Sequence, residues 1–200
     1  MTEAVIVATA RSPIGRANKG SLVEMRPDDM TAQILKALMA KVPQVKANDV
    51  EDLMLGIGQP AGEGGFNIAR VAAILAGLDD VPGVTVNRYC SSSLQTIRMA
   101  AHAIKAGEGD CFIAAGVETV SRYMSGASDT APNPVFKTPG ERTKLRAGGG
   151  QPTWTAPQGL PDYYIAMGQT AENVREIEGV TRQEMDEWGA RSQQRAVANQ

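Results

Sequence analysis

The sequence predicts an α/β protein, in which helices cover the faces of a mixed or mainly parallel sheet. Over the first part of the chain, short uncharged apolar runs alternate with segments whose apolar residues recur at helical spacing. The first run, Ala4–Ala8, is apolar throughout, which is typical of a strand covered on both faces. The resulting order is β-α-β-α-β-α-β, and an apolar fraction of 42% is sufficient to form a core.

Four strands are expected in this part of the chain. They are residues 4–8, 53–56, 84–86 and 111–116. The first helix begins at Pro27, because proline is favoured in a first turn and the acidic residues Asp28 and Asp29 suit the positive end of a helix. Its expected apolar face is Met30, Ile34, Leu35, Leu38 and Val42.

The next two helices have recognisable ends. A glycine-rich loop, Gly56–Gly65, leads to the second helix, which Asn67 is expected to cap and Gly77 to end. The third helix has Lys105 in its last turn and Gly107 as its C-cap. The expected apolar faces are Ile68, Val71, Ala72 and Leu75 in the second helix, and Leu94, Ile97, Ala101 and Ile104 in the third.

The pattern changes after Glu118. Residues 121–161 are rich in proline, include Gly148–Gly150 as an expected hinge, and contain no long periodic segment. A loop of this length is usually functional or disordered. Helices are expected again at residues 170–178 and 181–198.

The last helix has the clearest start in the chain. Thr181 and Glu184 are spaced as a capping box, and Val180 and Met185 as a hydrophobic staple. Trp188 in this helix, like Trp154 before it, is expected to be a packing residue.

Composition excludes several classes of function. The net charge of −2 provides no basic surface for nucleic acid or membrane, and no uncharged apolar stretch is long enough to span a bilayer. Glu3 and an immediate strand argue against a signal peptide, so a cytoplasmic protein with free thiols at Cys90 and Cys111 is expected. No metal is expected, because His102 is the only histidine and no Cys-x-x-Cys is present.

Cys90 lies where the third strand turns into the third helix. The first turn of a helix has unpaired N–H groups and a partial positive charge, which favour a thiolate and can also stabilise a developing oxyanion. Cys90 is therefore a candidate nucleophile. Its placement alone does not show that Cys90 is reactive, because a lone cysteine is most often a small buried packing residue.

Other candidate sites are weaker. Residues 56–61 match Gly-x-Gly-x-x-Ala, but the following helix is delayed to Asn67, so the dinucleotide fingerprint lacks its helix N-terminus. His102 is three turns along the helix from Cys90 and too far away to act as its base. Cys111 is expected to be an inert residue of an apolar strand.

Several segments resemble the thiolase family. They are residues 3–15, 67–70, 86–95, 110–118 with 121–122, and 167–173. The segment around Cys90 resembles the one around the family's acyl-accepting cysteine. Together with Met167–Asn173 it is a specific signature of the thiolase family. Thiolase-like condensing enzymes that act on carrier-protein thioesters lack the second motif.

The resemblance implies a fold and a reaction. Residues 1–120 would form a thiolase-like α/β core, half of a layered αβαβα fold, and residues 121–200 part of an inserted loop domain. Cys90 would accept the acyl group of a 3-ketoacyl-CoA, with coenzyme A as co-substrate and no permanently bound cofactor. Met167 would contact the substrate pocket.

The resemblance covers only the first half of a thiolase. The family's catalytic histidine, second catalytic cysteine and an asparagine-bearing motif belong to the second half, so these residues alone are expected to be inactive. The expected partners are further copies in a homo-oligomer, a dimer or tetramer, or a complementary chain that carries the second half.

Two residues depart from the family pattern. Ser93 replaces a usual glycine, with little expected effect. Ala166 stands where biosynthetic thiolases often have histidine, which favours the degradative type of fatty-acid β-oxidation. The alternatives are a biosynthetic acetyl-CoA C-acetyltransferase and a non-catalytic half-subunit.

Overall fold

A computed structural model of the protein describes residues 3–123, 133–137, 141, 144–145, 148 and 158–199. The chain forms two units, Met1–Thr130 and Ala131–Gln200. The assignment of residues 121–200 to an inserted loop domain stays a prediction.

The first unit is built on a parallel sheet with the strand order β2-β1-β3. The strands are β1 (Asp52–Gly56), β2 (Gly83–Val86) and β3 (Phe112–Gly116), which confirms three of the four expected strands. In the register of the sheet, Gly56 is opposite both Val86 and Gly116. The chain therefore leaves all three strands at the same edge of the sheet.

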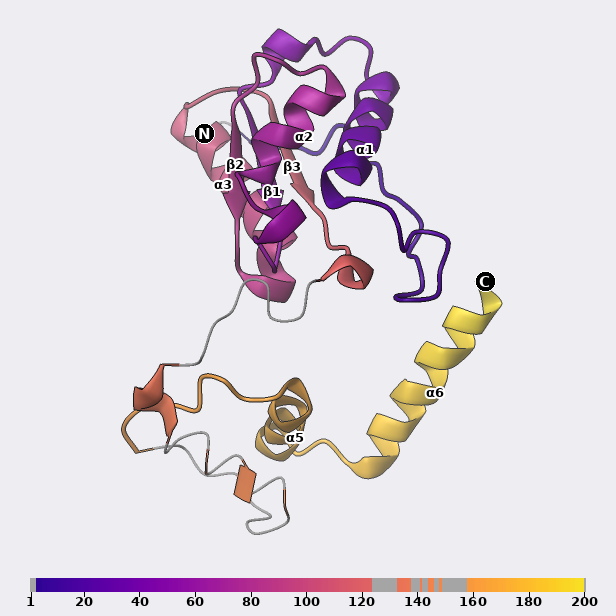
Figure 1. The fold of residues 1–200 in the computed structure, drawn as a ribbon, viewed down its shortest axis with the longest axis vertical. Coiled ribbons are helices and arrows are strands. Elements are labelled where there is room, and N and C mark those ends of the chain that lie inside the picture. Colours follow the sequence, from indigo (N-terminus) through magenta and orange to yellow (C-terminus); the bar gives the residue numbers. More distant parts are fainter. Residues whose placement is uncertain are drawn as a thin grey trace. The chain divides into compact units, whose positions relative to one another are not determined.

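Helices cover both faces of this sheet (Figure 1). α1 (Pro27–Lys41) and α2 (Ile68–Ala76) pack on one face, where Leu53 and Leu55 of β1 join their core. Met54, the residue between these two, belongs to a second core with Ala100 and Ala103 of α3 (Ser92–Ala106). This alternation along β1 gives three layers, helix–sheet–helix, and confirms the α/β fold class.

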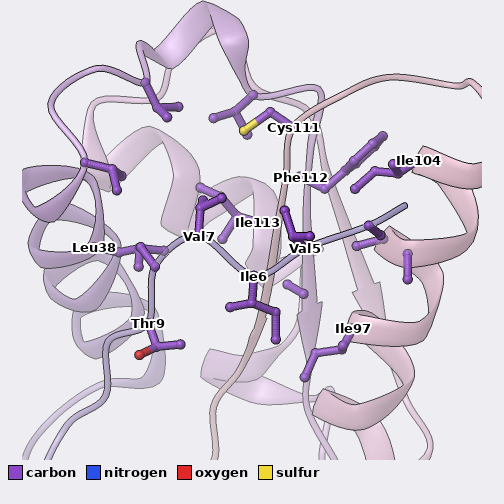
Figure 2. A pocket seen from close by; sticks show the side chains of 18 of the residues that line it. Val5, Ile6, Val7, Thr9, Leu38, Ile97, Ile104, Cys111, Phe112 and Ile113 are labelled. Atoms are coloured by element: carbon purple, nitrogen blue, oxygen red, sulfur yellow. The ribbon is translucent and has the colours of Figure 1, made fainter. Parts of the chain in front are cut away.

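The expected strand at residues 4–8 is wrong. Residues 3–10 belong to no strand or helix, and β1 pairs directly with β3, so both edges of β1 are already occupied. The segment lies between α1 and α3 over a hollow of about 400 Å³ (Figure 2). Its side chains Val5, Ile6 and Val7 stay 70%, 75% and 72% exposed. Among the described residues, this segment makes no backbone hydrogen bond to the outer edge of β2 or of β3, so the apolar run covers the hollow without joining the sheet.

The apolar face expected for the third helix is also wrong. The side of α3 that is buried carries small residues, namely Ser92, Thr96, Ala100 and Ala103. Leu94 and Ile97 are 68% and 46% exposed instead. The start of α3 approaches the sheet so closely that large side chains do not fit there, as the glycines of β1 and β3 described below demonstrate.

The caps predicted for α2 and α3 are observed, except that the side chain of Asn67 does not cap its helix. Gly77 and Gly107 are C-caps in the left-handed conformation, as expected. Asn67 is the N-cap residue of α2, but its φ of 54° turns its side chain away from the helix. Its amide nitrogen donates to the Gly83 carbonyl and its oxygen accepts from the Thr85 hydroxyl, both at 2.8 Å, so Asn67 fastens α2 to β2.

The second unit contains a short 3-10 helix, η5 (Pro134–Phe136), and the helices α5 (Met167–Glu178) and α6 (Arg182–Ala198). Phe136 and Tyr164 meet edge to face at 5.6 Å between ring centroids. The expected capping box at the start of α6 is confirmed, because both of its hydrogen bonds are present.

Trp188 is not packed in this unit. It is 64% exposed, and the guanidinium of Arg191 stacks 4.1 Å from its ring centroid. Trp154, Gly149 and Gly150, along with most of the proline-rich segment, lie outside the described residues.

Candidate active site at the carboxyl edge of the sheet

Cys90 lies at the edge where the three strands end. It belongs to a single 3-10 turn, η3 (Tyr89–Ser91), which separates β2 from α3 and is exposed along its whole length. The expected placement between strand and helix is confirmed. In parallel α/β sheets this carboxyl edge is where ligands bind, so a nucleophile there is accessible to a substrate.

The turn that carries Cys90 is strained and held by hydrogen bonds. Tyr89 has φ of 44°, in the left-handed region that side chains rarely adopt. Its N–H donates to Asn87 Oδ1 at 2.8 Å, and its carbonyl accepts from the buried Ser92 hydroxyl at 2.7 Å. The same hydroxyl accepts from the Arg88 N–H at 2.8 Å. Strain of this kind persists only where the surroundings impose it, and it is concentrated at functional sites.

Glycines bring the start of α3 directly onto the strands. A Cβ placed on Gly56 would lie 2.6 Å from the carbonyl carbon of Ser92, and one on Gly116 would lie 2.6 Å from Ser93 Cβ. The fully buried Thr96 hydroxyl adds a hydrogen bond across this contact, to the Ala115 carbonyl of β3 at 3.1 Å. The helix start below Cys90 is therefore fixed against two strands.

Glu118 follows β3 and faces the same edge. Its Oε2 accepts the Gly58 N–H at 2.7 Å. Burial raises the pKa of Tyr123, and a hydrogen bond with the Glu118 side chain raises this pKa further, so Tyr123 and Glu118 are in contact. Sequence reasoning missed Glu118 and Tyr123 as parts of the site. The available signal was a charged residue immediately after an apolar strand that ends at the ligand-binding edge.

An ion-pair network fixes the loops beside the site. Glu63, in the glycine-rich loop, accepts from Arg26 Nη1 at 2.9 Å and from Arg122 Nε at 2.6 Å. Arg26 also pairs with the buried Asp28 at 2.7 Å, and Arg122 with the exposed Glu24 at 3.3 Å. The hydrogen bond from Arg122 lowers the pKa of Glu63, against the opposing effect of burial.

Residues 4–200 match the family described as "Thiolase, N-terminal domain". The chain belongs to the thiolase family. A 3-ketoacyl-CoA thiolase of Bacillus subtilis (strain 168) is 40% identical over 198 residues, which are 98% of this chain and 45% of that protein. A 3-ketoacyl-CoA thiolase of Shewanella loihica is 40% identical over 99% of this chain and 46% of its own length.

A third thiolase has a different name. The beta-ketoadipyl-CoA thiolase of Acinetobacter baylyi is 42% identical over 203 residues, which are 100% of this chain and 49% of that protein. The chain thus spans about half the length of the thiolases that it matches. Within the described part of the chain, no helix is long and apolar enough to cross a membrane.

The remaining candidate residues of this thiolase chain lie away from Cys90 or outside its unit. Cys111 precedes β3 at the opposite end of the sheet, and burial raises the pKa of its thiol, which suits the inert role expected for it. His102 is exposed on α3. Met167 is the first residue of α5 in the second unit and is 70% exposed, and its contact with substrate stays a prediction.

Ser93 is the second residue of α3, and Ala166 is the N-cap of α5. Residue 93 lies in regular helix, a backbone conformation that does not require glycine. α2 begins at Ile68, several residues after the Gly-x-Gly-x-x-Ala segment, so the expected delay of this helix is confirmed. Among the residues that the structure describes, no group of three or more His, Cys, Asp or Glu side chains is placed to hold a metal ion.

Proposed function

We propose that this chain carries the acyl-accepting cysteine of a thiolase, and that this cysteine is Cys90. The observation that supports the proposal is an exposed thiol in a strained, hydrogen-bonded turn between a parallel strand and a helix N-terminus. The strain at Tyr89 and the close glycine contacts below the turn hold the thiol at one position relative to the sheet.

The proposed reaction is covalent, ping-pong acyl transfer. The Cys90 thiolate attacks the 3-keto carbon of a 3-ketoacyl-CoA, and a carbon–sulfur bond forms. The bond between C2 and C3 breaks, its electron pair stays on C2, and protonation of C2 releases acetyl-CoA. The thiolate of a second coenzyme A then attacks the acyl-Cys90 thioester and releases acyl-CoA and the free Cys90 thiolate.

The chain supplies part of what this reaction needs. The N–H of Cys90 is a proposed donor to the oxyanion that forms during each attack. By the family resemblance, the groups that move protons belong to the second half of the fold. The proposed partners are therefore the second half of a thiolase and further copies in a homo-oligomer, in a cytoplasmic enzyme without a permanently bound cofactor.

The proposed substrates are acyl-CoA thioesters. Relatives named for 3-ketoacyl-CoA and for beta-ketoadipyl-CoA have similar identity to this chain, so a linear 3-ketoacyl chain and one with a terminal carboxylate are both candidates. Ala166 favours the degradative direction in lipid breakdown, and condensation to acetoacetyl-CoA is the alternative.

Mass spectrometry of the acylated protein tests the proposal. The full-length protein is incubated with 3-ketoacyl-CoA or 3-oxoadipyl-CoA without free coenzyme A, and the modified peptide is mapped. We expect acylation at Cys90, its removal by added coenzyme A, and no acylation in Cys90→Ala, with Cys111→Ala as the matched control. Acylation at Cys111, or full turnover by Cys90→Ala, would contradict the assignment.

A further inference from the structure

We propose that Glu118 is a positioning residue of the Cys90 site, because its carboxylate ties the backbone of Gly58 to the segment after β3 and so holds Gly58 beside the turn that carries the cysteine. The effect on catalysis rests on the function proposed above, whereas the structural tie does not.

The first step is the link between two strand ends. The last ladder hydrogen bond between β1 and β3 at this edge runs from the Val117 N–H to the Gly56 carbonyl at 3.0 Å. Beyond it, the hydrogen bond from Gly58 to the Glu118 carboxylate continues the pairing across 60 residues of sequence. Hydrogen bonds to a charged acceptor are stronger than those between neutral groups. Glu118 therefore fastens the segment after β1 to the segment after β3.

The second step is the contact between this link and the turn. A Cβ placed on Gly58 would meet Glu118 Oε2 at 2.8 Å and Tyr89 Cα at 3.7 Å, so the Gly58 backbone faces Tyr89 across a space that a single added carbon would fill. Tyr89 holds the strained φ of 44° next to Cys90. Releasing Gly58 removes one side of the support that keeps this backbone strained.

The third step concerns what the carboxylate contributes. Besides the Gly58 N–H, the Glu118 carboxylate hydrogen-bonds the Tyr123 side chain, and burial together with this bond raises the pKa of Tyr123. Glu118 therefore acts as a hydrogen-bond acceptor, for the Gly58 N–H at 2.7 Å and for the Tyr123 side chain, and only the bond from Gly58 reaches the segment after β1.

Four variants of the full-length protein separate these effects. Glu118→Gln and Glu118→Ala both lose the charge, but only Gln keeps an acceptor oxygen for Gly58. Glu118→Asp keeps the charge but shortens the side chain by one methylene, so its oxygen no longer reaches the Gly58 N–H. This variant tests the same hydrogen bond if Glu118→Ala does not fold. Glu24→Gln is the matched control, because Glu24 is an exposed carboxylate on the neighbouring ion-pair network.

Two measurements are made on each variant. Hydrogen exchange by mass spectrometry reports the amides of Gly58 and of Tyr89–Ser91, and the rate of acyl transfer from acyl-CoA to Cys90 reports chemistry. For Glu118→Ala and Glu118→Asp we expect exchange at Gly58 to rise and acylation to fall, each by about 10-fold or more. We expect Glu118→Gln and Glu24→Gln to stay within about threefold of the parent, since each keeps the Gly58 hydrogen bond.

Wild-type exchange in both Glu118→Ala and Glu118→Asp would overturn the proposal, and so would a Glu118→Gln variant that exchanges like Glu118→Ala. A parent protein whose Cys90 is never acylated would overturn the proposed function alone, because the exchange data would still decide the role of Glu118.

Discussion

The contact between Gly116 and Ser93 allows a test of how closely the Cys90 helix sits on the sheet. In Gly116→Ala the new Cβ would lie 2.6 Å from Ser93 Cβ, closer by about 0.8 Å than the 3.4 Å at which ordinary contacts begin. The helix start has little freedom to move away, because Ser92 and Thr96 bond it to the turn and to β3. We expect Gly116→Ala to lower the free energy of unfolding by about 2–3 kcal/mol, the upper part of the range for overpacking.

Removing the Ser93 side chain should relieve this clash. Without it, the nearest atom to the new Cβ is Ser93 Cα at 3.5 Å, an ordinary contact. Ser93→Gly alone should cost about 0.5 kcal/mol, from the lower helix propensity of glycine. The double-mutant cycle should therefore yield a coupling energy of about 1–3 kcal/mol between residues 93 and 116.

Equilibrium urea unfolding of the parent, both single variants and the double variant measures this coupling. Gly56→Ala is the matched control, because its Cβ would meet the backbone of Ser92 and Ser93 at 2.6 and 2.8 Å, which Ser93→Gly does not remove. An additive cycle for Gly116, or an equal rescue of Gly56→Ala, would refute the proposed contact between α3 and β3.

Three further predictions concern titration and activity. Glu63 has a lowered pKa in the folded protein, so its ion pairs stabilise the fold above the ordinary value of 4.5 and this contribution disappears as the pH falls below it. The difference in unfolding free energy between the parent and Glu63→Gln should therefore be largest at neutral pH and shrink in acid, and a difference independent of pH would contradict the network. Burial raises the pKa of Asp52, and its Oδ1 has no hydrogen-bond partner within the described residues, so ionisation destabilises the folded state above the ordinary value of 3.8. Asp52→Asn should raise the melting temperature at pH 7 but not below pH 3.8, and a lower melting temperature at pH 7 would refute this sign. Residues 1–200 alone should show no thiolysis of 3-ketoacyl-CoA, because each missing acid–base group contributes about 10²–10⁴-fold; measurable turnover in a spectrophotometric assay would show that this half contains the whole catalytic set.

Local patterns predicted the local parts of the fold. The three strands of the sheet, the glycine C-caps at Gly77 and Gly107 and the capping box of α6 depend on residues close in sequence, and all are present. The buried side of α3 depends on the distance between helix and sheet, which Gly56 and Gly116 set from elsewhere in the chain. Periodicity chose the larger apolar residues and was wrong, because the close approach admits only small ones.

The candidate site likewise has a part that the sequence predicts and a part that depends on contacts between distant residues. The position of Cys90 follows from the strand before it and the helix after it, so sequence alone located it. The hydrogen bond between Gly58 and Glu118 joins residues 60 positions apart, and it forms only because two parallel strands end at one edge. The strain at Tyr89 likewise comes from neighbours in space, so no spacing rule for tyrosine predicts it.

The exposed run Val5–Val7 has a consequence during protein synthesis. The neighbouring strands β2, β1 and β3 of the described sheet are all parallel, so none of these pairs forms as a local hairpin, and β1 pairs with β3 only after β3 has left the ribosome. The run precedes β3 by about a hundred residues, and translation at about 5–20 residues per second leaves it without its final surroundings for roughly 5–20 s. A short uncharged segment rich in β-branched residues is prone to self-association as long as its neighbours in the fold have not been synthesised. Nascent chains of this protein are therefore expected to bind chaperones at residues 4–8 before the Cys90 turn exists.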